Sequence, residues 1–188
     1  MLPRALNAVR GPVEITRRWV SEVVIGLNLC PFARTPFDRG RIRYTLGAAG
    51  TRDDAYPALI REIADFARLP AEVAETGLFI VPRGLEDFSD YLLVLEDAQA
   101  AVAESGLEEM LQLASFHPDY RFEGLDEEDP ANYTNRSPFP LFHLIRQDGL
   151  AAALASWPDP ASIPRRNIAL LREVGLDAIH KLLDRIGE

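Results

Sequence analysis

The chain has 188 residues, 47% of them hydrophobic, which is enough for one sizeable core, so we expect a single domain over residues 1–188. Its 20 basic and 29 acidic side chains give a net charge of −9, which disfavours nucleic acids and anionic membranes as partners. The single cysteine, Cys30, excludes an internal disulfide. With no secretory signal and no run of about eighteen apolar residues for a membrane span, a cytoplasmic protein is expected.

The amino-terminal part is predicted to be an arm followed by a core-facing helix. Residues 1–11 end at a Gly-Pro pair and are expected to form a loose arm. Over residues 13–29, apolar side chains recur at intervals of three and four, as they do on one face of an amphipathic helix. Pro31 disfavours helical geometry in the residue before it, so we expect this helix to end near Cys30.

Three segments have the patterns of strands, at about 41–46, 76–81 and 110–115. The segments between them, 53–69 and 87–106, have capping residues and apolar stripes typical of helices. Strands and helices that alternate in this way predict an α/β fold with a small, mainly parallel sheet of at least three strands flanked by helices.

The remainder of the chain is predicted to be helical. Ser137 is expected to cap a helix that begins at residues 138–140 and, after an interruption at Asp148-Gly149, continues towards Trp157. Residues 158–188 have apolar stripes at helical spacing and are expected to form a helical C-terminal extension.

A long segment lies between the third strand and that helix. Its apolar residues recur with neither the spacing of a helix nor that of a strand, which indicates a functional or a disordered loop. Six of the sixteen aromatic residues fall within residues 111–142, and disordered segments are poor in aromatic residues. We therefore expect a packed loop. Ligands of open α/β sheets bind outside the carboxyl ends of the strands, where this loop begins, so the site is predicted to be built by residues 116–146.

Three residues are candidates for catalysis. His117 directly follows the third strand and is suited to act as an acid or base, although it could equally bond only to the loop backbone. His143 is placed on the polar edge of the predicted helix, where a surface histidine is the alternative. Cys30 is a candidate nucleophile, but a position near a helix carboxyl end opposes the thiolate and structural burial is the alternative.

The candidate ligand-binding residues are mostly polar side chains of the same loop. Arg136 is suited to bidentate binding of a carboxylate or phosphate, although an ion pair with the acidic run 126–129 would satisfy it equally well. The asparagines could instead bond the loop backbone. The other side chains expected to orient a ligand are Asp119, Tyr120, Asn132, Tyr133, Asn135 and Arg146.

Metal and cofactor motifs are absent from the sequence. Cys30, His117 and His143 are residue types that bind a catalytic zinc ion, but no two of them form the close pair that usually anchors a metal. No glycine-rich phosphate loop is present either. We therefore predict no metal site, and no cofactor is assigned.

Three long stretches resemble a known family. They are WVSEVVIGLNLCPFA at residues 19–33, ASFHPDY at residues 114–120 and DPANYTNRSP at residues 129–138. Together they are similar to the bacterial family catalogued as domain of unknown function 1415, and the resemblance spans nearly the whole chain. It implies a family but no activity and no catalytic residues.

The leading hypothesis from the residues is an enzyme that acts on a small anionic metabolite by hydrolysis or group transfer. In this hypothesis His117 is the acid or base and Arg136 binds the anion. The first alternative is a ligand-binding or regulatory module that holds a small molecule without transforming it. The second alternative is a protein-contact surface formed by the aromatic loop, for example in a homodimer.

Overall fold

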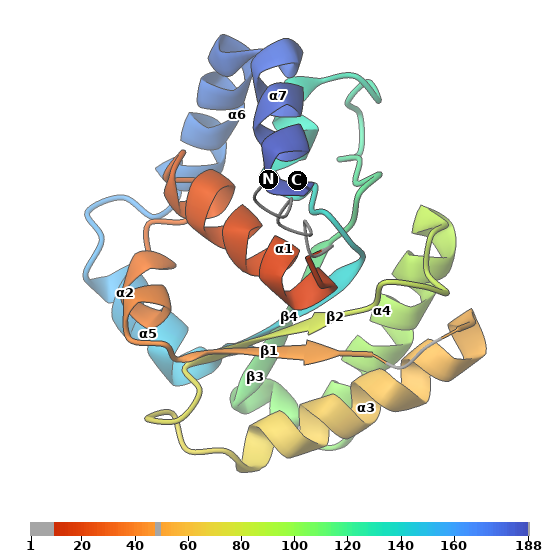
Figure 1. Ribbon diagram of the computed structural model, residues 1–188. Helices are drawn as coiled ribbons and strands as arrows, with labels where there is room; N and C mark the ends of the chain where they lie inside the picture. The colour runs from red at the N-terminus through yellow and green to blue at the C-terminus, as the bar shows by residue number, and fades with distance from the viewer. Residues whose placement is uncertain (1–9, 48–49, 188) are drawn as a thin grey trace, which may run out of the picture.

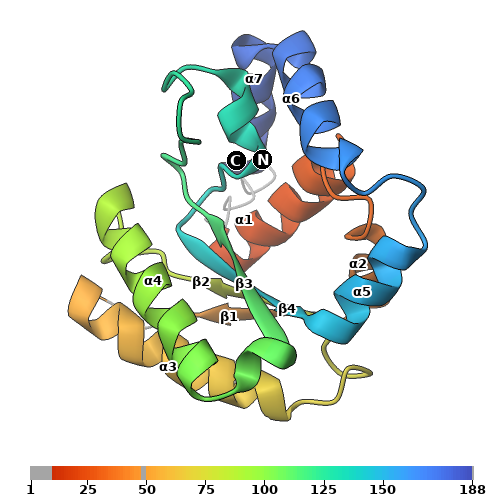
Figure 2. The ribbon, with the colours of Figure 1, turned by 180° about the vertical axis from the view of Figure 1, so that it is seen from behind.

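The structure is a computed structural model that describes residues 10–47 and 50–187, so most of the predicted N-terminal arm lies outside the described residues. It has a four-stranded sheet with helices on both faces (Figures 1 and 2). The strands are β1 (Ile42–Leu46), β2 (Thr76–Ile80), β3 (Leu111–Phe116) and β4 (Leu141–Arg146). The helices are α1 (Pro12–Trp19), the π-helical turn η1 (Val20–Ile25), α2 (Arg34–Asp38), α3 (Arg52–Arg68), α4 (Phe88–Glu104), the 3-10 turns η2 (Leu107–Glu109) and η3 (Pro130–Thr134), α5 (Gln147–Ala155), α6 (Ser162–Val174) and α7 (Leu176–Gly187).

The sheet is mixed, with the strand order β1-β2-β4-β3. Strands β1 and β2 are parallel, whereas β4 is antiparallel to both of its neighbours, β2 and β3. The predicted α/β fold is confirmed, and the three predicted strands match β1, β2 and β3 to within one residue at each end. The prediction of a mainly parallel sheet is wrong, because β4 inserts between β2 and β3.

The prediction of a helix that starts at residues 138–140 is wrong for its first part. Residues Leu141–Arg146 form strand β4, and the helix α5 starts only at Gln147 and continues through Gly149 without the predicted interruption. A strand between two others buries side chains on both faces, so its sequence LFHLIR has no clear alternation of apolar and polar residues. The predicted C-terminal helices are confirmed as α6 and α7.

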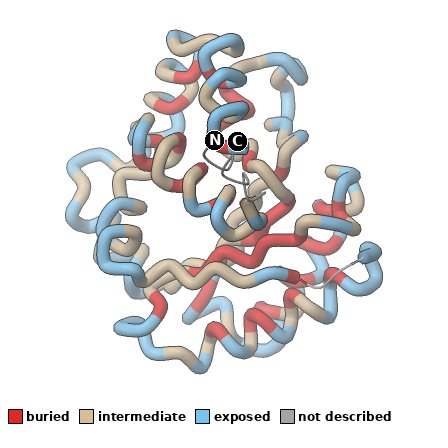
Figure 3. The backbone as a smooth tube through the Cα atoms, in the orientation of Figure 1, coloured by how far each residue is buried: buried red, intermediate tan, exposed pale blue. Residues whose placement is uncertain are grey.

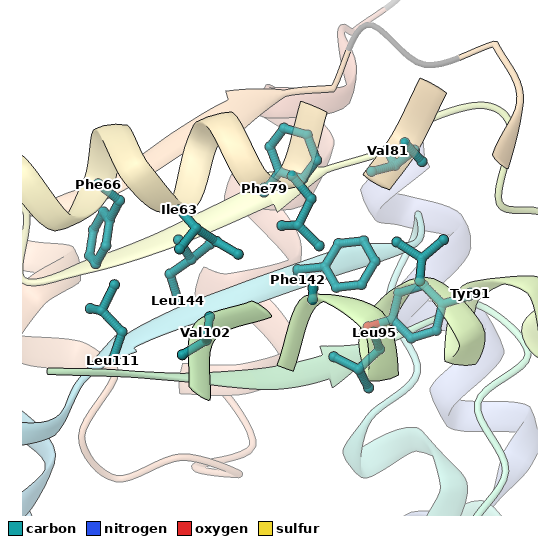
Figure 4. Packing of buried hydrophobic residues seen from close by; sticks show 14 of the residues in the cluster. Ile63, Phe66, Phe79, Val81, Tyr91, Leu95, Val102, Leu111, Phe142 and Leu144 are labelled. Carbon is teal, nitrogen blue, oxygen red and sulfur yellow. The ribbon is translucent and has the colours of Figure 1, made fainter. Parts of the chain in front are cut away.

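One face of the sheet is covered by α3 and α4 (Figures 1 and 2). Figure 4 shows Phe66 of α3 and Tyr91 of α4 directed towards Phe79, Phe142 and Leu144 of the two central strands. The rings of Tyr91 and Phe142 stack with centroids 4.7 Å apart. Burying one such side chain stabilises the folded state by about 2 kcal/mol, so the packing of α3 and α4 holds the sheet in place.

The opposite face of the sheet is covered only in part. Trp19, which is 2% exposed, packs edge-on against Phe116 with ring centroids 5.4 Å apart, and η1 continues along the same face. Helices α6 and α7 lie outside α1, whereas α2 and α5 lie side by side near the start of β1 (Figures 1 and 2). In Figure 3 the buried positions follow β2 and the inner sides of the helices, while β1 is only half-buried. This uneven covering leaves room beside the sheet.

Candidate functional site

A cavity of about 1160 Å³ lies between the sheet, η1, α2 and α5. Its wall is mainly apolar and includes Trp19, Val24, Leu78, Phe116, Ile145 and Trp157. The first residues of β1 and β2, Ile42 and Thr76, also line it. The cavity therefore reaches the amino ends of the parallel strands, whereas sequence reasoning placed the site at their carboxyl ends.

His143 is the central polar group of the cavity wall. It lies on β4, where the alternation of the strand turns Phe142 and Leu144 towards α3 and α4 and turns His143 towards the cavity. The sequence prediction of a helical surface position for this residue is therefore wrong. Its Nε2 atom lies 2.6 Å from the Thr76 hydroxyl oxygen, and that oxygen lies 2.8 Å from the Leu144 carbonyl oxygen.

These two contacts fix which ring nitrogen of His143 carries the proton. A carbonyl oxygen only accepts, so the single hydroxyl proton of Thr76 must lie between the two oxygen atoms. Nε2 must then be the protonated nitrogen and donate to Thr76, because the hydroxyl has no second proton to offer. Nδ1 consequently carries a lone pair.

Nδ1 of His143 is open to the cavity. No other described residue hydrogen-bonds to it, and it is not among the enclosed polar atoms that lack a partner, so it is reachable by solvent. Burial of the ring against apolar side chains lowers the pKa of His143 from its usual 6.5 to about 4. At neutral pH the cavity thus presents an uncharged hydrogen-bond acceptor.

Cys30 is half-buried in the cavity wall, between η1 and α2. The chain turns there because Asn28 adopts a left-handed conformation with φ of 53°, and the buried Asn167 of α6 donates to the Leu29 carbonyl at 2.7 Å. Burial raises the pKa of the Cys30 thiol, and the nearby N–H groups of Phe32 and Ala33 offset this only in part. The side chain is therefore a neutral thiol at pH 7, which is a poor nucleophile.

Charged side chains gather at the rim of the cavity and balance one another. Glu75 accepts from Arg41 at 2.7 Å and from Arg39 at 3.4 Å. The remaining charged residues of the rim are Glu72, Asp148 and Arg146. Three basic and three acidic groups give the rim no net charge, so it does not select for an anion.

The side of the cavity formed by α5 is loosely packed. None of the residues of α5 is buried, and the segment after it contacts the body of the protein through Trp157, whose ring meets that of Phe32 with centroids 5.8 Å apart. Both tryptophans of the chain, Trp19 and Trp157, line the cavity. Their fluorescence is therefore a direct reporter of what enters it.

The model of the family described as protein of unknown function (DUF1415) matches residues 12–181. The chain belongs to this family. No curated protein and no solved structure matched the chain in the other two comparisons. All three stretches that resemble the family contribute to the cavity wall, through Trp19 and Cys30, through Phe116 and through Asn135. The family description names no activity, so any function has to be argued from the cavity.

His117 has a structural position, with both ring nitrogens bonded to backbone groups. The residue is 0% exposed, its Nε2 bonds to the Leu85 carbonyl at 2.9 Å, and its Nδ1 accepts from the N–H of Asp119 at 3.0 Å. The ring also packs against Phe88 and Tyr91. Both nitrogens are engaged, so His117 has no free atom for proton transfer to a ligand, and burial lowers its pKa.

Arg136 is likewise engaged by the loop in which it lies. Its guanidinium donates to the carbonyls of Tyr120 at 3.0 Å and Glu127 at 2.8 Å, and it stacks over the ring of Tyr133 at 4.9 Å. Within the acidic run, Asp129 pairs with Arg172 at 2.6 Å. Arg136 therefore shapes the loop and does not face the cavity.

The other candidate residues divide between the loop and the cavity. Asn132 is fully buried and bonds three backbone groups of the loop, and the Tyr133 hydroxyl lies 2.7 Å from Nε2 of His180. Tyr120 packs against Phe88. In contrast, Asn135 and Arg146 line the cavity, although Asn135 donates to the Ser115 carbonyl and Arg146 to three carbonyls around the end of α3.

Thr76 is the polar side chain of the cavity wall that sequence reasoning missed. It is the first residue of an apolar strand, and its contact with His143 joins positions 67 residues apart. A hydroxyl at the start of a strand has no local pattern that distinguishes it. Among residues 10–47 and 50–187, no three His, Cys, Asp or Glu side chains are grouped so that they could hold a metal ion. Every helix in these ranges is too short or too polar to cross a bilayer.

Proposed function

We propose that the protein binds a small organic molecule with a largely apolar body in the cavity between the sheet and α5. The observation that carries this proposal is the cavity itself, which is slightly larger than the roughly 300–1,000 Å³ of most ligand pockets and combines apolar walls with few polar groups. Both the cavity-lining π-helical turn η1 and the exposed polar atom of His143 are features common at functional sites.

The anionic metabolite predicted from the sequence has less support. Arg136 donates to backbone carbonyls of its own loop, and the rim of the cavity has equal numbers of acidic and basic groups. The three arginines that line the cavity are already engaged, Arg39 and Arg41 by Glu75 and Arg146 by backbone carbonyls, so an anion would have to compete for them. We therefore propose a ligand that is neutral where it contacts the wall.

Catalysis by hydrolysis or group transfer is the second candidate, because His143 offers an unprotonated nitrogen to the cavity. A base whose conjugate acid has a pKa of about 4 accepts protons weakly, and the neutral Cys30 thiol adds no activated nucleophile. Binding is therefore better supported. The test is hydrolysis of a p-nitrophenyl ester. Catalysis would be favoured if His143→Gln abolished this hydrolysis but still bound the product p-nitrophenol.

The test is a titration with N-phenylnaphthylamine, a neutral fluorescent probe that accepts excitation energy from tryptophan. We expect saturable binding to one site that quenches Trp19 and Trp157. Ala114 lies opposite His143 in the sheet and lines the cavity, so Ala114→Phe should fill the space and weaken binding at least about tenfold. Ala103→Phe on the exposed side of α4, over the other sheet face, is the matched control. Absence of saturable binding, or equal affinity of both variants and the original protein, would refute the proposal.

A further inference from the structure

We infer that the natural ligand is a neutral molecule that donates a hydrogen bond, from a hydroxyl or an N–H group, to Nδ1 of His143, and that Thr76 sets this preference. The inference rests on the proposed binding function and narrows the class of ligand.

The first step is the direction of the hydrogen bonds. The Thr76 hydroxyl donates to the Leu144 carbonyl at 2.8 Å and accepts from Nε2 of His143 at 2.6 Å. The proton on Nε2 is therefore held by the sheet, since the accepting carbonyl belongs to the backbone of β4 itself. Nδ1 can only accept, so the ligand must donate.

The second step concerns what Nδ1 rejects. An ether oxygen or a carboxylate placed against Nδ1 would bring two lone pairs together and leave a buried acceptor unpaired. A carboxylate could bind only if the imidazole took up a proton, and the apolar surroundings oppose this because they lower the pKa of His143. Alcohols, phenols and indole-like N–H compounds satisfy the acceptor without any charge.

The third step is that no described residue donates to Nδ1 of His143 in this structure, and the nearby polar side chains of the wall donate elsewhere. Asn135 also lines the cavity, but its amide N–H donates to the Ser115 carbonyl at 3.0 Å. The Arg146 guanidinium donates to the carbonyls of Phe66, Leu69 and Ala74. Among the described residues Nδ1 therefore has no hydrogen-bond partner, and a ligand in the cavity can supply the missing donor.

The test compares three compounds with the same naphthalene body, substituted at the same ring position by a hydroxyl, a methoxy or a carboxylate group. Affinities are measured by displacement of N-phenylnaphthylamine. We expect the naphthol to bind about tenfold more tightly than the methoxy compound, the value of one hydrogen bond, and the carboxylate to bind most weakly. If the methoxy compound or the carboxylate binds as tightly as the naphthol, the inference is overturned while the proposed function stands.

Variants of Thr76 show whether this residue acts by fixing the tautomer of His143 or only by filling space in the cavity wall. In Thr76→Val both tautomers of His143 become available, so the naphthol and the methoxy compound should bind with similar affinities, whereas Thr76→Ser should keep the tenfold ratio. A long-range proton–nitrogen NMR spectrum of the unliganded protein should show the proton on Nε2 of His143. A proton on Nδ1, or an unchanged ratio in Thr76→Val, would contradict the inference. If N-phenylnaphthylamine itself fails to bind, the proposed function fails, and the NMR spectrum still decides the tautomer.

Discussion

Replacing His143 by glutamine is expected to remove a pH-dependent part of the protein's stability. The imidazole is neutral in the folded protein because its pKa falls from the usual 6.5 to about 4. In the unfolded chain the same ring takes up a proton near pH 6.5. Protons therefore bind preferentially to the unfolded state between these two pKa values, and the free energy of unfolding falls as the pH is lowered through this range. The loss disappears only well above pH 6.5, where the imidazole is neutral in the unfolded chain as well.

The magnitude follows from the two pKa values. Between about pH 7.5 and about pH 5.5, a group with pKa values of about 4 and 6.5 in the folded and unfolded states changes the free energy of unfolding by about 1.3 kcal/mol. This is an upper bound, since the cavity admits water to the ring. Glutamine does not titrate, and its amide can still donate to Thr76, so the variant keeps the local hydrogen bond.

The assay is urea denaturation followed by circular dichroism at both pH values, for the original protein and for His143→Gln. The lower pH remains above the pI of about 4.9, where the protein would be least soluble. All other titrating groups are common to both proteins, so the difference between the two pH dependences isolates His143. Equal losses of stability in both proteins would refute the reasoning. An NMR titration that places the pKa of His143 near 6.5 would do the same.

Two further predictions concern the other candidate residues. His117→Ala should lower the free energy of unfolding by about 3 kcal/mol, because it removes a buried ring and two hydrogen bonds. Replacing the exposed His180 by alanine should lower it by less than about 1 kcal/mol. Similar urea midpoints for the two variants would show that His117 does not hold the loop. The Cys30 thiol should react with Ellman's reagent more slowly at pH 7 than free cysteine does, and its rate should still be rising at pH 9, since burial raises its pKa. A rate that levels off below pH 8 would instead indicate an activated thiolate.

The sequence predicted the elements whose patterns are local. Strands β1, β2 and β3 and helices α3, α4, α6 and α7 each have a period or a cap that can be recognised within about ten to twenty residues. The same method failed for β4, because LFHLIR has apolar residues on both faces, at four of its six positions, and so lacks the alternation of a half-buried strand. The strand order could not be predicted either, since it depends on which strands pair across long separations.

The candidate site shows the same division. Cys30, Asn135, His143 and Arg146 were chosen for their chemistry and do line the cavity, although the loop in which sequence reasoning centred the site mostly packs on itself. His117 and Arg136 have the right chemistry, but their polar atoms are engaged by backbone groups. Residue type indicates what a side chain can do, whereas its neighbours decide whether any atom is left to do it.

By itself the amino-acid sequence determined the family, the α/β character and a set of polar residues, because these depend on composition and on patterns over short distances. Only the tertiary structure decided that β4 lies between β2 and β3 and so brings His143 beside Thr76. The physical reason is that the tautomer of an imidazole depends on the partners of its two nitrogens. In this protein the partner comes from another strand, 67 residues away along the chain.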